Sequence, residues 1–264
     1  MADESRKKFP ALSSFLLAAV LVALVGGAYW LKTRPKLPGG GAVVGLESME
    51  ALLARGIREH LAGSYDAAMD IYHKVLQRDP ANAQAHYNLG QIYNTRGRYA
   101  QAQWEYEAAL KTDPQSLDAR LNLGVVLYRQ RQFAPAAREF QKVVEVSPKH
   151  VVALFDLGVA LLELGQADQA LRWLTASLRE DPKRPDTHYY LGVALERKRR
   201  FPEARAALLK VLELSPQYVD AHLALARVYM AQGERRLAAE ALAKATALRP
   251  PATRSLPPAG KAGK

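Results

Sequence analysis

The chain has 264 residues, 49% of them hydrophobic, which allows one large or two small domains with a sizeable buried core. It contains no cysteine, which excludes disulfides, thiolate metal sites and cysteine nucleophiles. The formal net charge of +11 is concentrated in residues 1–45 and 251–264, so the middle is a body of mixed charge and we expect no nucleic-acid partner.

The first feature along the chain is an apolar run. Residues 9–31 carry no charge, and Leu, Ala and Val dominate them. As a helix this run would span roughly 34 Å at about 1.5 Å per residue, enough for a hydrocarbon core of about 30 Å. Basic residues flank it on both sides, and Tyr29 and Trp30 stand where a headgroup boundary would lie. The run predicts a single transmembrane helix preceded by a basic tail, residues 1–8.

A cleaved secretory signal is the alternative, with Gly26 and Ala28 at its processing site. The apolar run continues past that point and basic residues then close it, which favours an uncleaved anchor. Basic residues balance on the two sides, so the positive-inside rule leaves the orientation open. Single anchors with a basic start commonly export the domain on their C-terminal side. We therefore expect the body outside the cytoplasmic (inner) membrane, in the periplasm of a Gram-negative cell. The Pro/Gly-rich residues 32–48 predict a flexible linker.

Beyond the linker, the sequence repeats itself every 34 residues. Proline recurs at this spacing after each helical run, as expected of a helix stop, at Pro80, Pro114, Pro148, Pro182, Pro216 and Pro250. A small residue recurs upstream, at Gly56, Gly90, Gly124, Gly158, Gly192 and Ala226. An alanine recurs between the two, at Ala68, Ala102, Ala136, Ala170, Ala204 and Ala238. Small residues let helices approach closely, so the pattern predicts six helical hairpins over residues 49–250.

This pattern resembles the tetratricopeptide repeat (TPR). Repeat two follows the family pattern most fully, with Leu89, Gly90, Tyr93, Gly97, Tyr99, Ala102, Tyr106, Ala109 and Pro114. The resemblance implies an all-α, right-handed superhelical solenoid of six helix-turn-helix units, whose first helices line a concave groove. The pentatricopeptide family, an RNA reader of similar period, lacks this signature of Gly, Ala and Pro.

The resemblance also implies that proteins or extended peptides bind in the groove. Residues of the first helices that are not used for packing form the candidate site. It is polar and rich in amides in repeat two, and aromatic and aliphatic in repeats four and five. The candidates are Tyr87, Asn88, Gln91, Asn94, Asn122, Val125, Tyr128, Arg129, Phe155, Asp156, Val159, Tyr189, Tyr190, Arg197 and Arg227.

Two groups of candidates have competing interpretations. Asn88 and Asn122 occupy the same position of successive units, and an amide can both donate to and accept from a peptide backbone. The alternative is that these asparagines cap helices or are merely solvated. Phe155, Tyr189 and Tyr190 are predicted to anchor a bound chain. The alternative is that their rings pack between adjacent first helices.

Signatures of catalysis are lacking in the sequence. The six histidines show no zinc-helix spacing, and neither a Gly-rich phosphate loop nor a nucleophile elbow is present. We therefore expect no catalytic residues, no metal and no cofactor, and a protein that is not an enzyme.

The C-terminal end lacks the solvating helix that many relatives add after the last repeat. Pro250 and Pro251 end the last helix, and residues 251–264 are predicted to be a disordered basic tail. Residues 237–248 are mostly Leu and Ala, so we expect the uncapped C-terminal repeat to dock a partner or to form a homo-oligomer.

These features predict a membrane-tethered scaffold or adaptor in a cell-envelope assembly, such as a secretion, pilus, cell-wall or cytochrome-maturation machine. One alternative is a periplasmic, chaperone-like holder of exported or unfolded polypeptides. Another is a regulatory subunit of a membrane enzyme. The sequence does not distinguish the pathways, because its strong motifs are those that build the stack.

Overall fold

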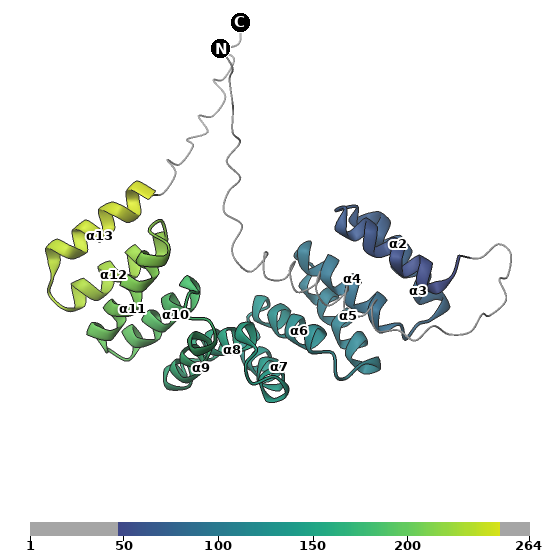
Figure 1. Ribbon diagram of the computed structural model, residues 1–264, viewed down its shortest axis with the longest axis horizontal. Coiled ribbons are helices and arrows are strands. Elements are labelled where there is room, and N and C mark those ends of the chain that lie inside the picture. The colour runs from purple at the N-terminus through teal and green to yellow at the C-terminus, as the bar shows by residue number, and fades with distance from the viewer. Residues whose placement is uncertain (1–46, 249–264) are drawn as a thin grey trace, which may run out of the picture. The chain divides into compact units, whose positions relative to one another are not determined.

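The computed structural model describes residues 47–248, which form twelve helices and no strand (Figure 1). The predicted anchor (9–31), nearly all of the predicted linker and the predicted C-terminal tail lie outside this range. Within it, no helix combines the length and the apolar character needed to cross a membrane. The helices are α2 (Met49–Leu61), α3 (Tyr65–Arg78), α4 (Ala83–Thr95), α5 (Tyr99–Thr112), α6 (Leu117–Arg129), α7 (Phe133–Val146), α8 (Val151–Glu163), α9 (Ala167–Glu180), α10 (Pro185–Arg197), α11 (Phe201–Leu214), α12 (Val219–Ala231) and α13 (Arg235–Leu248).

The helices pair into six hairpins, which confirms the all-α solenoid predicted from the 34-residue spacing. Each helix packs on the next one along the chain (Figure 1). The backbones of the first helices of neighbouring hairpins, α2, α4, α6, α8, α10 and α12, also approach one another closely, whereas within residues 47–248 those of the second helices do not. The first helices are therefore the more closely spaced row, and together they form one continuous surface, which we call the first-helix face.

Local sequence sets where the first helices start and stop. The side chains of Ser48, Asn82 and Ser116 accept a backbone N–H from the first turn of α2, α4 and α6. The turn after four of the first helices contains a glycine at positive φ. Arg131 and Arg199 occupy the same position of units three and five, with φ of 61° and 58°. A side chain at such φ is strained, so these two turns are less stable than their glycine counterparts.

A close approach inside each hairpin explains the repeated small residue. A Cβ atom added to Gly124 would lie 2.5 Å from Cε1 of Phe140, well inside van der Waals contact. In the first five units the residue at this position is fully buried: Tyr72, Tyr106, Phe140, Leu174 and Leu208. In the sixth unit alanine replaces the glycine, at Ala226, and its neighbour Leu242 is 47% exposed. No further helix covers α13 among the described residues, and this also contributes to the exposure of Leu242.

The side chain at the fourth position of the unit, in the first turn of the first helix, binds the turn that connects this hairpin to the preceding one. The ring Nε2 atoms of His86, His188 and His222 lie 2.9 to 3.1 Å from the carbonyl oxygen of the preceding Pro80, Pro182 and Pro216. Arg120 reaches the corresponding oxygen of Pro114 at 2.7 Å. These side chains satisfy a carbonyl that no helix uses, so their role in units two, three, five and six is structural.

The outer surface of the first hairpin differs from the internal interfaces. Arg55 and Arg58 stand at the positions where the second unit has the buried Leu89 and Ile92. Arg55 forms an ion pair of 2.9 Å with Glu47, and Arg58 is exposed. This end of the stack is therefore closed by charged side chains in place of aliphatic ones.

Candidate functional site

The candidate site is the first-helix face, and the structure distributes the predicted residues on it by exposure. Four of them are buried: Asn88, Phe155, Asp156 and Val159. The others keep part of their surface in solvent: Tyr87, Gln91, Asn94, Asn122, Val125, Tyr128, Arg129, Tyr189, Tyr190, Arg197 and Arg227. The residues that can meet a partner directly therefore belong to the second group.

A hydrogen-bonded cluster connects the first helices of units two and three. The hydroxyl oxygen of Tyr87 accepts from Gln91 Nε2 at 3.0 Å and from Asn122 Nδ2 at 3.2 Å. Burial raises the pKa of the Tyr87 phenol, and the nearby Asp118 carboxylate adds to the effect. The phenol therefore stays neutral and holds α4 and α6 in register.

Asn88 is buried and only partly satisfied. Its Oδ1 accepts from Gln84 Nε2 at 3.3 Å, while its Nδ2 has no hydrogen-bond partner. Neither Asn88 nor Asn122 is a helix cap, because Asn82 and Ser116 cap α4 and α6. A buried amide donor without an acceptor is costly, and in native proteins such groups call for an explanation.

Asp156 occupies the equivalent position of α8 and is also incompletely paired. Its side chain is buried, and Oδ2 has no hydrogen-bond partner. Burial raises the pKa of this carboxyl to about 7, although Arg184 and Arg129 oppose the rise. Near neutral pH, Asp156 therefore exists both as an acid, which can donate a hydrogen bond, and as a carboxylate, which can only accept one.

Aromatic rings dominate the face from unit four to unit six. Phe155 is only 1% exposed; its ring lies edge-on to Tyr190 at 5.6 Å, and the Arg184 guanidinium lies 5.2 Å from the ring centre. The sequence pattern placed Phe155 among the anchors for a bound chain. In the structure it supports Tyr190 from beneath, which agrees with the packing alternative.

Tyr218 belongs to this region but was not among the residues predicted from the sequence. It precedes α12, and its ring lies 5.4 Å from that of Tyr189. Its hydroxyl donates to Asp186 Oδ1 at 2.8 Å. The predicted candidates came only from within the first helices, whereas Tyr218 lies just before one. A signal was present in the sequence: the first three units have Ser48, Asn82 and Ser116 there, and tyrosine is not a capping residue.

Two of the three predicted arginines are engaged within the protein. Arg227 binds Glu196 through two hydrogen bonds of 2.8 Å, and Arg197 Nη1 donates to the carbonyl oxygen of Leu162. Arg129 is exposed at the end of α6 and lowers the pKa of Asp156. Bidentate pairing fixes the Arg227 side chain in place.

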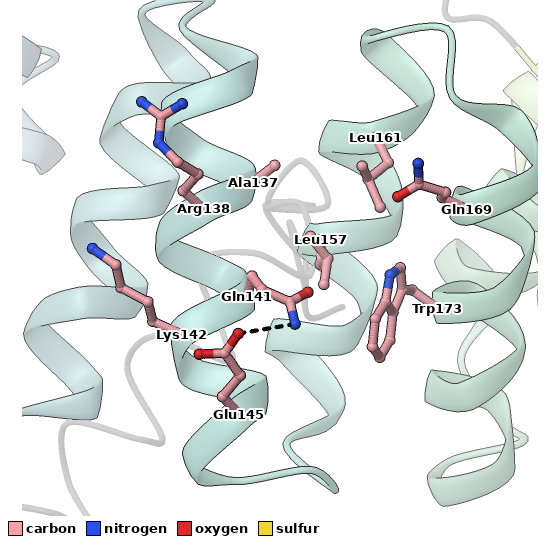
Figure 2. Close-up of a pocket in the computed structure, with 9 residues that line it drawn as sticks. All are labelled: Ala137, Arg138, Gln141, Lys142, Glu145, Leu157, Leu161, Gln169 and Trp173. Carbon is pink, nitrogen blue, oxygen red and sulfur yellow. Dashed lines mark hydrogen bonds between the residues drawn. The ribbon is translucent and has the colours of Figure 1, made fainter.

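A separate cleft of about 410 Å³ lies between α7 and α9, over α8 (Figure 2). Ala137 lines it at a position where the other units carry Met69, Gln103, Leu171, Arg205 or Ala239. Figure 2 shows the Trp173 ring standing at one side of it and Arg138 and Lys142 at the other. The cleft is lined by Ala137, Arg138, Gln141, Lys142, Glu145, Leu157, Leu161, Gln169 and Trp173. Within residues 47–248 no three His, Asp or Glu side chains lie close enough together to hold a metal ion.

Comparisons with known proteins agree on the repeat. Two family models described as tetratricopeptide repeat match residues 126–185 and 155–219, and residues 60–105 and 194–254, respectively. A third, described as TPR repeat, matches residues 90–130. A search of the curated proteins gave no significant match.

Several solved structures share the fold. The structure of pilF from Pseudomonas aeruginosa is 23% identical with a TM-score of 0.64, and the match covers 77% of this chain and 92% of that one. MamA from Desulfovibrio magneticus RS-1 is 23% identical with a TM-score of 0.60, covering 63% of this chain and 94% of that one. YrrB, described as a TPR protein with an unusual peptide-binding site, is 22% identical with a TM-score of 0.57, covering 69% and 93%.

At these identities the structural likeness concerns the fold alone. The family models, in contrast, follow one another without a gap from residue 60 to residue 254 and describe the same repeat that the structure contains. The chain therefore belongs to the tetratricopeptide repeat proteins.

Proposed function

We propose that this protein is a membrane-tethered scaffold that binds an extended segment of a partner protein along its first-helix face. The observation that carries the proposal is a pair of unsatisfied polar atoms, Asn88 Nδ2 and Asp156 Oδ2, at the same position of units two and four. One is a donor and the other an acceptor. The main chain of an extended peptide offers both complements at regular intervals, and it would reach these two buried atoms once the side chains that cover them move aside.

Site-specific photo-crosslinking in cells tests this proposal. A benzoylphenylalanine placed at Tyr128 or Tyr189 of the full chain would lie on the first-helix face. The same probe at Arg138 or Arg172 would lie on exposed surface of the second helices α7 and α9. We expect discrete crosslinked products from the first pair and none from the second. Equal capture from both pairs would refute a role for this face.

The tether is the second part of the proposal, and it rests on the uncharged residues 9–31 and the basic residues around them. We propose that this run anchors the chain in the cytoplasmic membrane with the repeats on the outer side, where they contribute to an envelope assembly. The full chain should remain with membranes after a high-pH carbonate wash, and a chain starting at Gly45 should not.

A reporter fused after Gly260 tests the orientation. Alkaline phosphatase, which is active only outside the cytoplasm, should be active in this fusion. A reporter that fluoresces only in the cytoplasm, fused at the same position, should not fluoresce. The opposite pattern would place the repeats in the cytoplasm and would leave the proposed binding face unaffected.

A further inference from the structure

Three tyrosines form a row across units five and six. The rings of Tyr190 and Tyr189 lie 5.2 Å apart, nearly perpendicular, and the rings of Tyr189 and Tyr218 lie 5.4 Å apart. All three are partly exposed. We call Tyr189, Tyr190 and Tyr218 the tyrosine platform. Because Phe155 supports Tyr190 from beneath and Asp186 fixes the Tyr218 hydroxyl, the rings are held in place before any partner arrives.

The platform presents hydrogen-bond donors that the protein does not use. The hydroxyls of Tyr189 and Tyr190 form no hydrogen bond with any residue of 47–248, and they are not sealed from solvent, in contrast to the buried hydroxyls of Tyr72 and Tyr106. Burial of the rings raises the pKa of both phenols, so they remain protonated donors at any physiological pH. The platform therefore combines apolar ring faces with phenolic donors.

A negative charge lies beside the platform. Asp220 is exposed at the start of α12, and it forms no ion pair within the described range. Its charge raises the pKa of Tyr189, and the charge of Arg227 partly opposes that rise. The neighbouring Glu196, in contrast, is already neutralised by Arg227. Asp220 therefore favours a cationic group on any partner that binds there.

From these observations, and resting on the proposed function, we propose that the tyrosine platform binds a proline-rich segment of the partner that carries a basic residue. A polyproline II helix has no internal hydrogen bonds, so its carbonyl groups are free to accept from the tyrosine hydroxyls. It advances about 9 Å per turn, which is comparable to the two successive ring separations of 5.2 Å and 5.4 Å taken together. Its preformed shape also loses little conformational entropy on binding to aromatic grooves.

Other occupants match the platform less well. An amphipathic helix needs a continuous apolar groove, whereas the exposed edge of this surface is made of phenols. A strand binds by extending a sheet, and residues 47–248 contain no strand. The chemistry of the platform therefore favours a proline-rich chain over both.

Fluorescence anisotropy with a defined probe tests the proposal. The probe is a fluorescein-labelled peptide of sequence Pro-Pro-Leu-Pro-Pro-Arg-Pro-Pro, titrated with the full chain in detergent micelles. We expect saturable binding. A peptide with alanine at every proline should bind at least about tenfold more weakly. A peptide with glutamate in place of arginine should also bind more weakly, because Asp220 would repel it.

Variants of the platform locate the site. Tyr189→Phe and Tyr190→Phe keep the rings and remove only the hydroxyls, so the fold should be unchanged while the affinity for the probe falls about threefold to tenfold. Trp104→Ala, on the exposed surface of the second helix α5, is the control and should bind like the unaltered protein. The proposal would be overturned if the protein bound the alanine peptide as tightly as the proline-rich probe. It would also be overturned if both phenylalanine variants bound the probe as tightly as the unaltered protein.

The outcome separates this inference from the proposed function. If the probe fails to bind while Tyr128 and Tyr189 still crosslink to a partner in cells, the first-helix face is a binding site for a segment that is not proline-rich. If the crosslinks are absent as well, both proposals fail.

Discussion

The Nδ1 atom of His86 and the Oε2 atom of Glu105 lie 2.7 Å apart inside the second hairpin, where the first hairpin buries Leu52 and Ile71. Both side chains are buried, and burial raises the pKa of Glu105 while the bond to His86 lowers it. The third hairpin has a similar pair, Arg120 and Glu139, at 3.0 Å. The position therefore accepts an apolar pair or a polar pair, and in the fifth and sixth hairpins it holds a histidine opposite an alanine, His188 with Ala207 and His222 with Ala241.

The buried contact between His86 and Glu105 predicts how the second hairpin responds to substitution. Glu105→Ile alone should destabilise the protein by about 3 kcal/mol, because His86 would lose its buried partner. The double variant His86→Leu with Glu105→Ile copies the first hairpin and should recover most of the loss. Urea denaturation followed by circular dichroism measures both. If the double variant were as unstable as the single one, the pairing would not be the cause.

Asp156 predicts a pH dependence of stability. Its pKa is about 7 in the folded chain against an ordinary value of 3.8, so the folded state favours the protonated acid. The contribution is fully present below pH 3.8 and is lost as the pH rises through 7. Between pH 5 and pH 8 the loss should be about 2–3 kcal/mol. Asp156→Asn cannot ionise and should lose much less in urea titrations at the two pH values.

The matched control for this experiment is Asp220→Asn, which removes an exposed carboxylate from the neighbourhood of the same face. This variant should retain the pH dependence of the unaltered protein. If Asp156→Asn retained it too, Asp156 would be titrating as an ordinary solvated carboxyl.

Gly124 predicts a steric effect. The added methyl group of Gly124→Ala would meet the Phe140 ring at 2.5 Å, and the hairpin would have to open. We expect a destabilisation of about 1–3 kcal/mol. Adding Phe140→Ala should relieve the clash, so the two substitutions together should cost less than the sum of the separate effects in urea denaturation. Strict additivity would show that the ring and the methyl group do not meet.

The strained turn at Arg131 predicts a gain in stability. Arg131→Gly should stabilise the protein by about 1 kcal/mol, because glycine adopts a φ of 61° without steric cost. Arg98→Gly is the control, since Arg98 has a φ of −84° and gains nothing from glycine. A thermal melt in which both variants lose stability would mean that the Arg131 side chain contributes more than its strain costs.

Much of the fold could be predicted because it is local and repeated. The 34-residue spacing of proline and the small residues fixed the number of hairpins, and Gly124 opposite Phe140 shows the close approach that the small residues imply. The pairing of His86 with Glu105 was not predicted. These residues lie on different helices, and their match appears only when the hairpin closes and both lose solvent.

The candidate site was less predictable. The position of a residue in the repeat unit indicates which side of the helix it lies on, but it does not indicate whether neighbouring residues bury it. Asn88, Phe155 and Val159 lie on the first helices as expected, yet all three are buried. Tyr189 and Tyr190, in contrast, keep part of their surface in solvent. Tyr218 joins them from the turn before α12, a position that the helical repeat does not describe.

Cysteine protection in native membranes shows whether a partner covers the first-helix face, and it can be applied here because the chain contains no cysteine of its own. Single cysteines would replace Arg129 or Glu163 on the first-helix face, and Arg138 or Arg172 on the second helices; all four positions are exposed. Alkylation rates would be compared between intact membranes and the purified chain. A partner bound along the first-helix face predicts several-fold slower alkylation in membranes at Arg129→Cys and Glu163→Cys, with unchanged rates at the other two. Slowing at Arg138→Cys and Arg172→Cys alone would show that the partner binds the second helices and not the first-helix face.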